Sequence, residues 1–184
     1  MTFRFDDLSI NTDLDNLLNL LTVIWRREPE AEVYLAISPV VFSKDQLPLE
    51  QQQRVHPRIL TAGSSIQNYY RGQSCGIPKV PADERIRRAG HGIVHVDHRL
   101  LSRETQELSI VVSCSLVDAG LFIPPYNKWN RDTESICQEH GLDLVRFEDG
   151  WRHVLHNRFD PRFSLYYMHP YDLTPKALDH WFAS

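Results

Sequence analysis

The feature that most constrains the fold is a pair of β-branched, alternating runs in the middle of the chain. One run covers residues 92–101 and the other covers residues 107–117, and the polar pentapeptide Ser-Arg-Glu-Thr-Gln connects them. Val and Ile are enriched in strands, and a short polar connection between two such runs is typical of a β-hairpin. The two runs therefore predict a pair of antiparallel strands.

The remaining elements are predicted from hydrophobic periodicity and turn residues. Apolar residues at helical spacing predict an amphipathic helix over residues 13–27, which Thr12 begins and Pro29 ends. Further predicted elements are strands over 33–37 and 163–168, a second hairpin from 142–147 and 151–155, and helices over 64–71, 132–140 and from Thr174-Pro175 onward. Residues 72–81, rich in Gly and Pro, are expected to form a loop.

The predicted element order is α-β-α-β-β-α-β-β-β-α. Consecutive hairpins favour an α+β fold with a mainly antiparallel sheet and helices packed on one face. The chain has 184 residues with 4 Trp, 7 Tyr and 8 Phe, which is enough apolar bulk for one core. We therefore expect a single domain over residues 1–184.

Composition limits the setting in which the protein works. No apolar run reaches the roughly 18 residues of a membrane helix, so no membrane association is expected. The N-terminus lacks the basic-then-apolar order of a secretory signal, and the 3 Cys include no CxxC pair. These features predict a cytoplasmic protein, in which Cys114 and Cys137 occupy core positions. Because no phosphate-binding or dinucleotide motif is present, no cofactor is predicted.

The arginines suggest a class of ligand. The net charge of −4 argues against a polyanion partner for the whole chain, yet several arginines lie close together in sequence. They are Arg85, Arg87, Arg88, Arg99 and Arg103. Since the guanidinium fork suits carboxylates and phosphates, this region favours a small anionic ligand, while nucleic acid is the weaker alternative.

The densest group of chemically active side chains lies in the first of the two β-branched runs. On a strand, alternate residues share a face, so one face would carry His91, His95, Asp97 and Arg99. If the 102–106 connection closes symmetrically, Ser113 and Ser115 on the second strand join the same face. The predicted site therefore has His95 and Asp97 as catalytic residues, with ligand binding by His91, Arg88, Arg99, Ser113 and Ser115.

Two alternatives to such a site remain. Alternation also produces a polar sheet face that is simply solvated, as antiparallel sheets commonly have. His91 and His95 have the i, i+4 spacing of helical metal ligands, but the intervening Ile93 and Val94 argue against a helix, and no distant ligand can be named. We therefore predict no metal site.

Three functions are compatible with these observations. The preferred one is a binding or interaction domain with a polar ligand pocket on the 91–117 hairpin, because no motif specific for catalysis is present. The alternative is a small hydrolase- or lyase-like enzyme that uses the acid–base residues of that hairpin. The second alternative is a nucleic-acid-processing protein. A protein partner is also open, with Tyr126 and Trp129 as interface residues, and the sequence predicts no oligomeric state.

Overall fold

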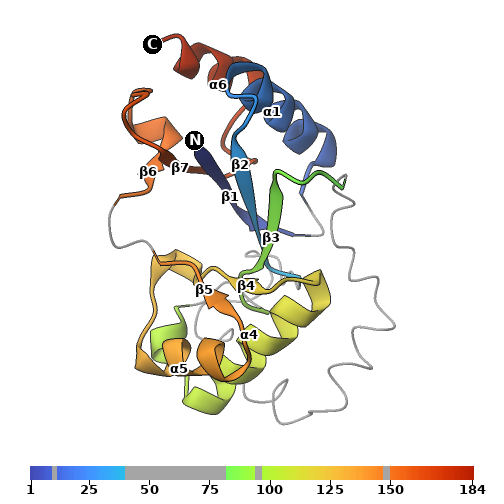
Figure 1. The fold of residues 1–184 in the computed structure, drawn as a ribbon, viewed down its shortest axis with the longest axis vertical. Coiled ribbons are helices and arrows are strands. Elements are labelled where there is room, and N and C mark those ends of the chain that lie inside the picture. Colours follow the sequence, from blue (N-terminus) through green and yellow to red (C-terminus); the bar gives the residue numbers. More distant parts are fainter. Residues whose placement is uncertain (10–11, 40–81, 94–96, 147–149) are drawn as a thin grey trace.

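A computed structural model describes residues 1–9, 12–39, 82–93, 97–146 and 150–184. Its sheet contains seven strands in the order β5-β4-β3-β2-β1-β7-β6. The strands are β1 (Thr2–Leu8), β2 (Glu32–Ile37), β3 (Ile86–Gly90), β4 (Leu121–Phe122), β5 (Asp143–Leu144), β6 (Arg152–His153) and β7 (Leu165–Met168). All six neighbouring pairs are parallel, and the sheet is curled into a half-barrel (Figure 1).

The parallel sheet shows that the predicted antiparallel fold is wrong. The second predicted strand, 107–117, lies within helix α4 (Arg103–Val117), and the first ends in a short 3-10 helix, η1 (His98–Leu100). The β-branched residues of this segment predicted a strand, but the segment is helical because α4 is stabilised at both ends. Ser102 caps its first turn by accepting from the Thr105 amide, and Asp118 ends it in the left-handed conformation.

Helix α4 buries residues at helical rather than strand spacing. The buried positions are Gln106, Ser109, Ile110, Ser113, Cys114 and Val117. Because three of these side chains are polar, the helical period is hidden from a reading of hydrophobicity alone. The helix approaches the sheet closely at Gly90, where an added Cβ would lie 2.6 Å from Cys114 Sγ and 2.8 Å from Ser113 Oγ.

The second predicted hairpin is also wrong. Its two expected strands are β5 and β6, which lie at opposite edges of the sheet and do not pair with each other. Residues 64–71 and 72–81, predicted as a helix and a loop, lie outside the described residues.

Several predictions from periodicity are confirmed. Helix α1 (Leu14–Arg27) follows the predicted range, although Asp13 rather than Thr12 caps it, and α5 (Arg131–Glu139) ends before Gly141. Strands β2 and β7 fall in predicted ranges, and Thr174 caps α6 (Pro175–Phe182). The other described helices are the short η2 (Pro125–Asn127) and η3 (Val154–His156).

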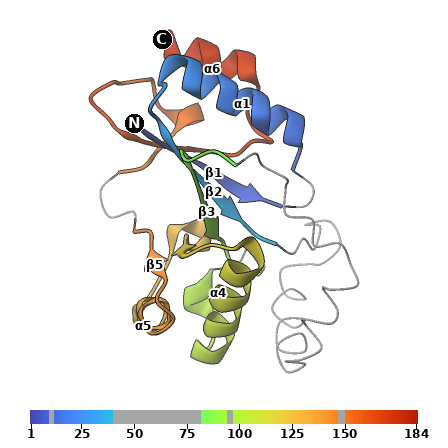
Figure 2. The same ribbon diagram turned by 45° about the vertical axis from the view of Figure 1, so that its right-hand side comes forward.

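The core lies between the sheet and its helices. Phe3 and Phe5 of β1 are fully buried and pack in one cluster with α1 and α6, which lie side by side (Figure 2). The alternate residues, Arg4 and Asp6, point to the opposite, concave face. None of the helices in the described part of the chain has the length and apolar character needed to span a bilayer.

Candidate functional site

The site begins at the end of β1, a strand that we did not predict. The pairing register of β1 with β2 shifts between Phe5 and Leu8, and Asp7 has a φ of 58°. Such a bulge redirects side chains, and positive φ at a non-glycine residue costs free energy that commonly accompanies a functional site. The bulge gives Asp6 and Asp7 separate sets of contacts at the carboxyl end of the strand.

Asp6 is held by a buried arginine. Arg4 Nη2 donates a hydrogen bond to Asp6 Oδ2, and the Arg4 side chain is fully buried. The Arg4 guanidinium carbon lies 4.9 Å from the ring centre of Tyr167 and 5.1 Å from that of Trp151. Among the described residues, no donor reaches the other oxygen, Oδ1. One oxygen of Asp6 is thus fixed, while the second is buried and accepts no hydrogen bond from the described residues.

Asp7 contacts side chains that follow two other strands, β3 and β7. Its Oδ1 lies 3.4 Å from His91 Nε2, directly after β3. Its Oδ2 lies 3.7 Å from His169 Nε2, after β7, and accepts a hydrogen bond of 2.9 Å from the Tyr171 hydroxyl. Because parallel strands end at the same edge of a sheet, residues far apart in sequence converge on this carboxylate.

His91 is anchored through its other ring nitrogen. Its Nδ1 lies 2.7 Å from the carbonyl oxygen of Ile123, which can only accept, so Nδ1 carries the proton. Nε2 then faces Asp7 either with a second proton or with its lone pair. This second arrangement is the usual one for a metal-bound histidine, whose remaining N–H is held by a carbonyl or carboxylate.

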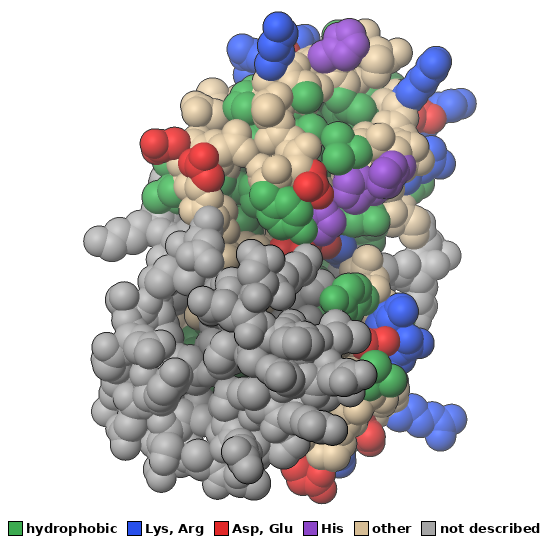
Figure 3. Space-filling model, turned by 180° about the vertical axis from the view of Figure 1, so that it is seen from behind, with side chains coloured by type: hydrophobic (Ala, Val, Ile, Leu, Met, Phe, Trp, Pro, Cys, Tyr) green, Lys and Arg blue, Asp and Glu red, His purple; other side chains and the backbone are tan. Residues whose placement is uncertain are grey.

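A second group of imidazoles adjoins Asp7. His169 Nδ1 lies 3.4 Å from Asp172 Oδ2 and 3.5 Å from His153 Nε2. The ring of His153 packs 4.7 Å from the rings of both His156 and Tyr167. Figure 3 shows histidine and acidic side chains next to one another on this face of the molecule. Burial first, and the neighbouring imidazoles of His169 and His156 second, lower the pKa of His153.

Aromatic side chains lie at the margin of the site. Tyr126 and Asn127, after β4, are consecutive non-glycine residues with φ of 57° and 56°. Tyr126 and Tyr171 are 51% and 62% exposed. Burial and the charge of Asp7 raise the pKa of both phenols, so the hydroxyls stay protonated at neutral pH.

Of the residues predicted for the site, His91 alone is a direct partner of Asp7 among those described. Asp97 caps η1 and forms a local ion pair with Arg99, whose hydrogen bond is the main cause of the lowered pKa of Asp97. Arg88 pairs in register with Leu35, which lies in the core under α1, so Arg88 is on the helix-covered face. His95 lies outside the described residues.

The predicted serines do not join this group. Ser113 is buried in α4 and donates to the Ile110 carbonyl, and Ser115 is exposed. The prediction that these serines share a sheet face with Asp97 was wrong. It required a strand, in which every second residue shares a face, whereas α4 has 3.6 residues per turn. Ser109 instead bonds to the Ile93 amide and to His98.

Sequence reasoning missed Asp6, Asp7, His153, His169 and Tyr171. A signal was present in Phe3-Arg4-Phe5-Asp6, whose strict alternation of apolar and charged residues is typical of a half-buried strand. The histidines carried no such signal, because residues 153 and 169 meet only through the pairing of β6 with β7.

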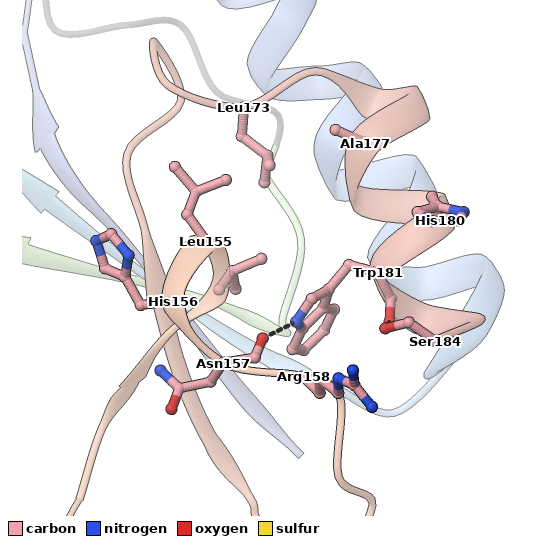
Figure 4. Close-up of a pocket in the computed structure, with 10 residues that line it drawn as sticks. Leu155, His156, Asn157, Arg158, Leu173, Ala177, His180, Trp181 and Ser184 are labelled. Atoms are coloured by element: carbon pink, nitrogen blue, oxygen red, sulfur yellow. Dashed lines mark hydrogen bonds between the residues drawn. The ribbon is translucent and has the colours of Figure 1, made fainter.

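A separate hollow of about 360 Å³ lies between η3 and α6. Its lining residues include Leu155, Leu173 and Trp181 together with His156 and His180 (Figure 4). Trp181 Nε1 donates to the Asn157 carbonyl at 2.6 Å, which closes one side. This hollow contains none of the residues around Asp7.

The fold and the site together define an α/β protein with a curled parallel sheet and an acidic and imidazole cluster at the carboxyl ends of its strands. This is the edge at which barrel-type folds place their active sites. In the described part of the chain, no group of three or more His, Cys, Asp or Glu side chains is arranged to hold a metal ion.

The same fold occurs in solved structures of carbohydrate esterases. The chain is similar over its whole length to 85% of a family 4 carbohydrate esterase from Streptomyces lividans (TM-score 0.57, 14% identity). It is similar over 99% of its length to 79% of the peptidoglycan deacetylase PdaC from Bacillus subtilis (TM-score 0.53, 12% identity). It also matches 59% of BA3943 from Bacillus anthracis, described as a family 4 pseudoenzyme (TM-score 0.56, 12% identity). At these identities the likeness is one of fold.

Comparison at the level of sequence gives no relative. No protein-family model matches the chain, and no curated protein matches it.

Proposed function

We propose that this protein is a hydrolase that removes an acyl group from a carbohydrate. The observation that carries the proposal is the contact of Asp7 with His91, His169 and Tyr171 at the carboxyl edge of the sheet. Carboxylates and imidazoles brought together in this way are the groups used for acid–base hydrolysis. The likeness of the fold to carbohydrate esterases and deacetylases supports this reaction over the binding function preferred from the sequence.

Asp6 is suited to activate the attacking water. Arg4 holds Asp6 Oδ2, and Oδ1 is left to accept the proton of a water molecule. The water oxygen then bonds to the acyl carbon, and the bond from that carbon to the sugar oxygen or nitrogen breaks. Asp6 delivers the proton to the leaving atom, so that a carboxylic acid and a free hydroxyl or amine result.

His169 is suited to stabilise the negative charge that develops during this step. Its Nε2 is directed at Asp7, so a substrate bound there would meet an N–H donor. A neutral imidazole can serve as such a donor, and a donor fixed before the reaction begins can contribute several kcal/mol of transition-state stabilisation, roughly 3.

Asp7 and His91 fit a divalent cation. The Ile123 carbonyl fixes the proton of His91 on Nδ1, which leaves Nε2 on the Asp7 side. A bound cation would polarise the acyl carbonyl and lower the pKa of a bound water. Two ligands are fewer than such a cation requires, and the described residues supply no third.

The exposed tyrosines support a sugar as the substrate. Tyr126 and Tyr171 present ring surface beside the acidic cluster, and a recognition site commonly combines flat aromatic surface with a few polar groups. Peptidoglycan and other carbohydrates are the substrates stated for the proteins of similar fold.

The test is release of acetate from acetylated xylo-oligosaccharides and from N-acetylglucosamine oligomers by the purified full-length protein. We expect turnover by the wild type, and a loss of at least about a hundredfold in Asp6→Asn, since the base is removed. Lys128→Ala is the control, because this exposed lysine lies 3.9 Å from Asp97 and outside the cluster. Binding of the oligomers without release of acetate would instead support a carbohydrate-binding protein.

A further inference from the structure

A chain of hydrogen bonds runs from the backbone of η3 to the site. The amide of Leu155 donates to His153 Nδ1 at 3.2 Å, so this nitrogen carries no proton. The proton of neutral His153 is therefore on Nε2, which lies 3.5 Å from His169 Nδ1. Only one of two facing nitrogens can carry the proton between them, so His169 Nδ1 is the acceptor.

This chain determines the position of the proton on His169. With Nδ1 accepting, neutral His169 carries its proton on Nε2, which is the nitrogen 3.7 Å from Asp7 Oδ2. We infer that His153 is a positioning residue that holds His169 in this tautomer, with its N–H directed at Asp7 and the reacting atoms. The inference rests on the proposed function, because it explains how His169 becomes a hydrogen-bond donor in the hydrolysis.

Asp172 competes with Asp7 for the proton of His169, so a donor from His153 is needed to decide its position. Asp172 Oδ2 lies 3.4 Å from the same His169 Nδ1, and a carboxylate can only accept. Asp172 therefore favours the proton on Nδ1, while Asp7 favours it on Nε2. The two carboxylates lie at similar distances, and the donor from His153 decides between them.

The surroundings of His153 keep it in the form that this role requires. Its side chain is buried and contacts the rings of His156 and Tyr167, and the charged groups facing it are His169, Asp172 and Asp6. Burial and the neighbouring imidazoles lower its pKa, which keeps the ring neutral. A neutral ring that already accepts from Leu155 has one remaining option, which is to donate from Nε2.

The test measures the tautomer and the activity separately. The ring ¹⁵N shifts of His169 are recorded at pH 8.5 in the wild type, in His153→Phe and in His153→Gln. His153→Phe keeps the packing on Tyr167 but removes the donor, and His153→Gln restores an N–H near the position of Nε2. We expect the proton of His169 to move from Nε2 to Nδ1 in His153→Phe, and to return in His153→Gln or in His153→Phe/Asp172→Asn.

The kinetic arm uses acetate release from the better carbohydrate substrate. We expect kcat to fall about tenfold in His153→Phe with KM unchanged, and to recover in His153→Gln; a tenfold change corresponds to about 1.4 kcal/mol. His156→Phe is the matched control, because His156 packs on His153 but is exposed. An unchanged His169 tautomer in His153→Phe overturns the inference. Lack of turnover by the wild type would overturn the proposed hydrolysis but would leave the tautomer result to be decided by the NMR spectra.

Discussion

The Tyr171 hydroxyl donates a hydrogen bond of 2.9 Å to Asp7 Oδ2, although 164 residues separate the two in sequence. This bond connects the segment after β7 to the bulge at the end of β1. It places an exposed aromatic ring next to the carboxylate around which the site is built.

Tyr171→Phe tests this contact. We expect catalytic efficiency to fall about fivefold, since a hydrogen bond of this kind contributes about 1 kcal/mol. Burial and the charge of Asp7 raise the pKa of Tyr171, so the phenol is the donor at every pH below about 10. The ratio of wild-type to variant activity should therefore be constant between pH 6 and 9, and a ratio that changes over this range would contradict the assignment.

The buried pair of Arg4 and Asp6 should be important for stability. Arg4→Met leaves the Asp6 carboxylate without its cation in a site with little solvent access, and breaking a buried pair in this way costs about 3–5 kcal/mol. Urea unfolding measures the loss. Arg103→Met is the control, because Arg103 and Glu139 form a more exposed pair that contributes about 1 kcal/mol or less. Equal losses in the two variants would show that burial of Arg4 has no special effect.

Gly90→Ala tests the close approach of α4 to β3. The added Cβ would lie 2.6 Å from Cys114 Sγ and 2.9 Å from the Cys114 backbone nitrogen, so the helix must move. We expect a loss of about 1–3 kcal/mol in the free energy of unfolding. A Cβ on Gly120 would meet nothing within 4 Å, which makes Gly120→Ala the matched control. Thermal unfolding of both variants gives the comparison.

Cys114 and Cys137 should be unreactive in the folded protein. Burial raises the pKa of Cys114 to about 11 and that of Cys137 to about 12, so thiolate is scarce at pH 8. We expect iodoacetamide to modify both thiols in urea but neither under native conditions, as measured by peptide mass spectrometry. Native modification at the rate of a free thiol would contradict the core positions of these residues.

Chelation tests the cation proposed for Asp7 and His91. We expect EDTA to abolish acetate release and Zn²⁺ or Co²⁺ to restore it, since these ions accept imidazole and carboxylate ligands. His91→Ala should weaken metal binding measured by calorimetry, while His140→Ala, which removes an imidazole paired with Glu107, should not. Full activity of metal-free protein would exclude a catalytic cation.

The sequence predicts those elements whose signal is local. The apolar stripe of α1 and the Thr174-Pro175 start of α6 are visible within a few residues, and both helices form where expected. Helix α4 was wrongly predicted as a strand because Ser109 and Ser113 lie on its buried side. Packing against β3 rather than hydrophobicity decides burial there.

The group of residues around Asp7 was not predicted, for a different reason. Asp7, His91 and His169 become neighbours through the order of strands in a parallel sheet, and no spacing in the sequence encodes that order. His91 was identified by its chemistry, but its predicted companions were taken from the same local segment. In the structure, the residues grouped with His91 come from β1 and from the end of β7.

The placement of β5 and β6 at the two edges of the sheet has a geometric consequence. Eight Cα steps lead from Leu144 to Arg152, which span at most about 29 Å when fully extended. Six inter-strand intervals of about 4.8 Å give a similar width for a flat seven-stranded sheet, and the connection must also return from the carboxyl edge to the amino edge. The connection from β5 to β6 is too short to cross a flat sheet and also to return to its amino edge. This connection therefore limits how far the half-barrel can open.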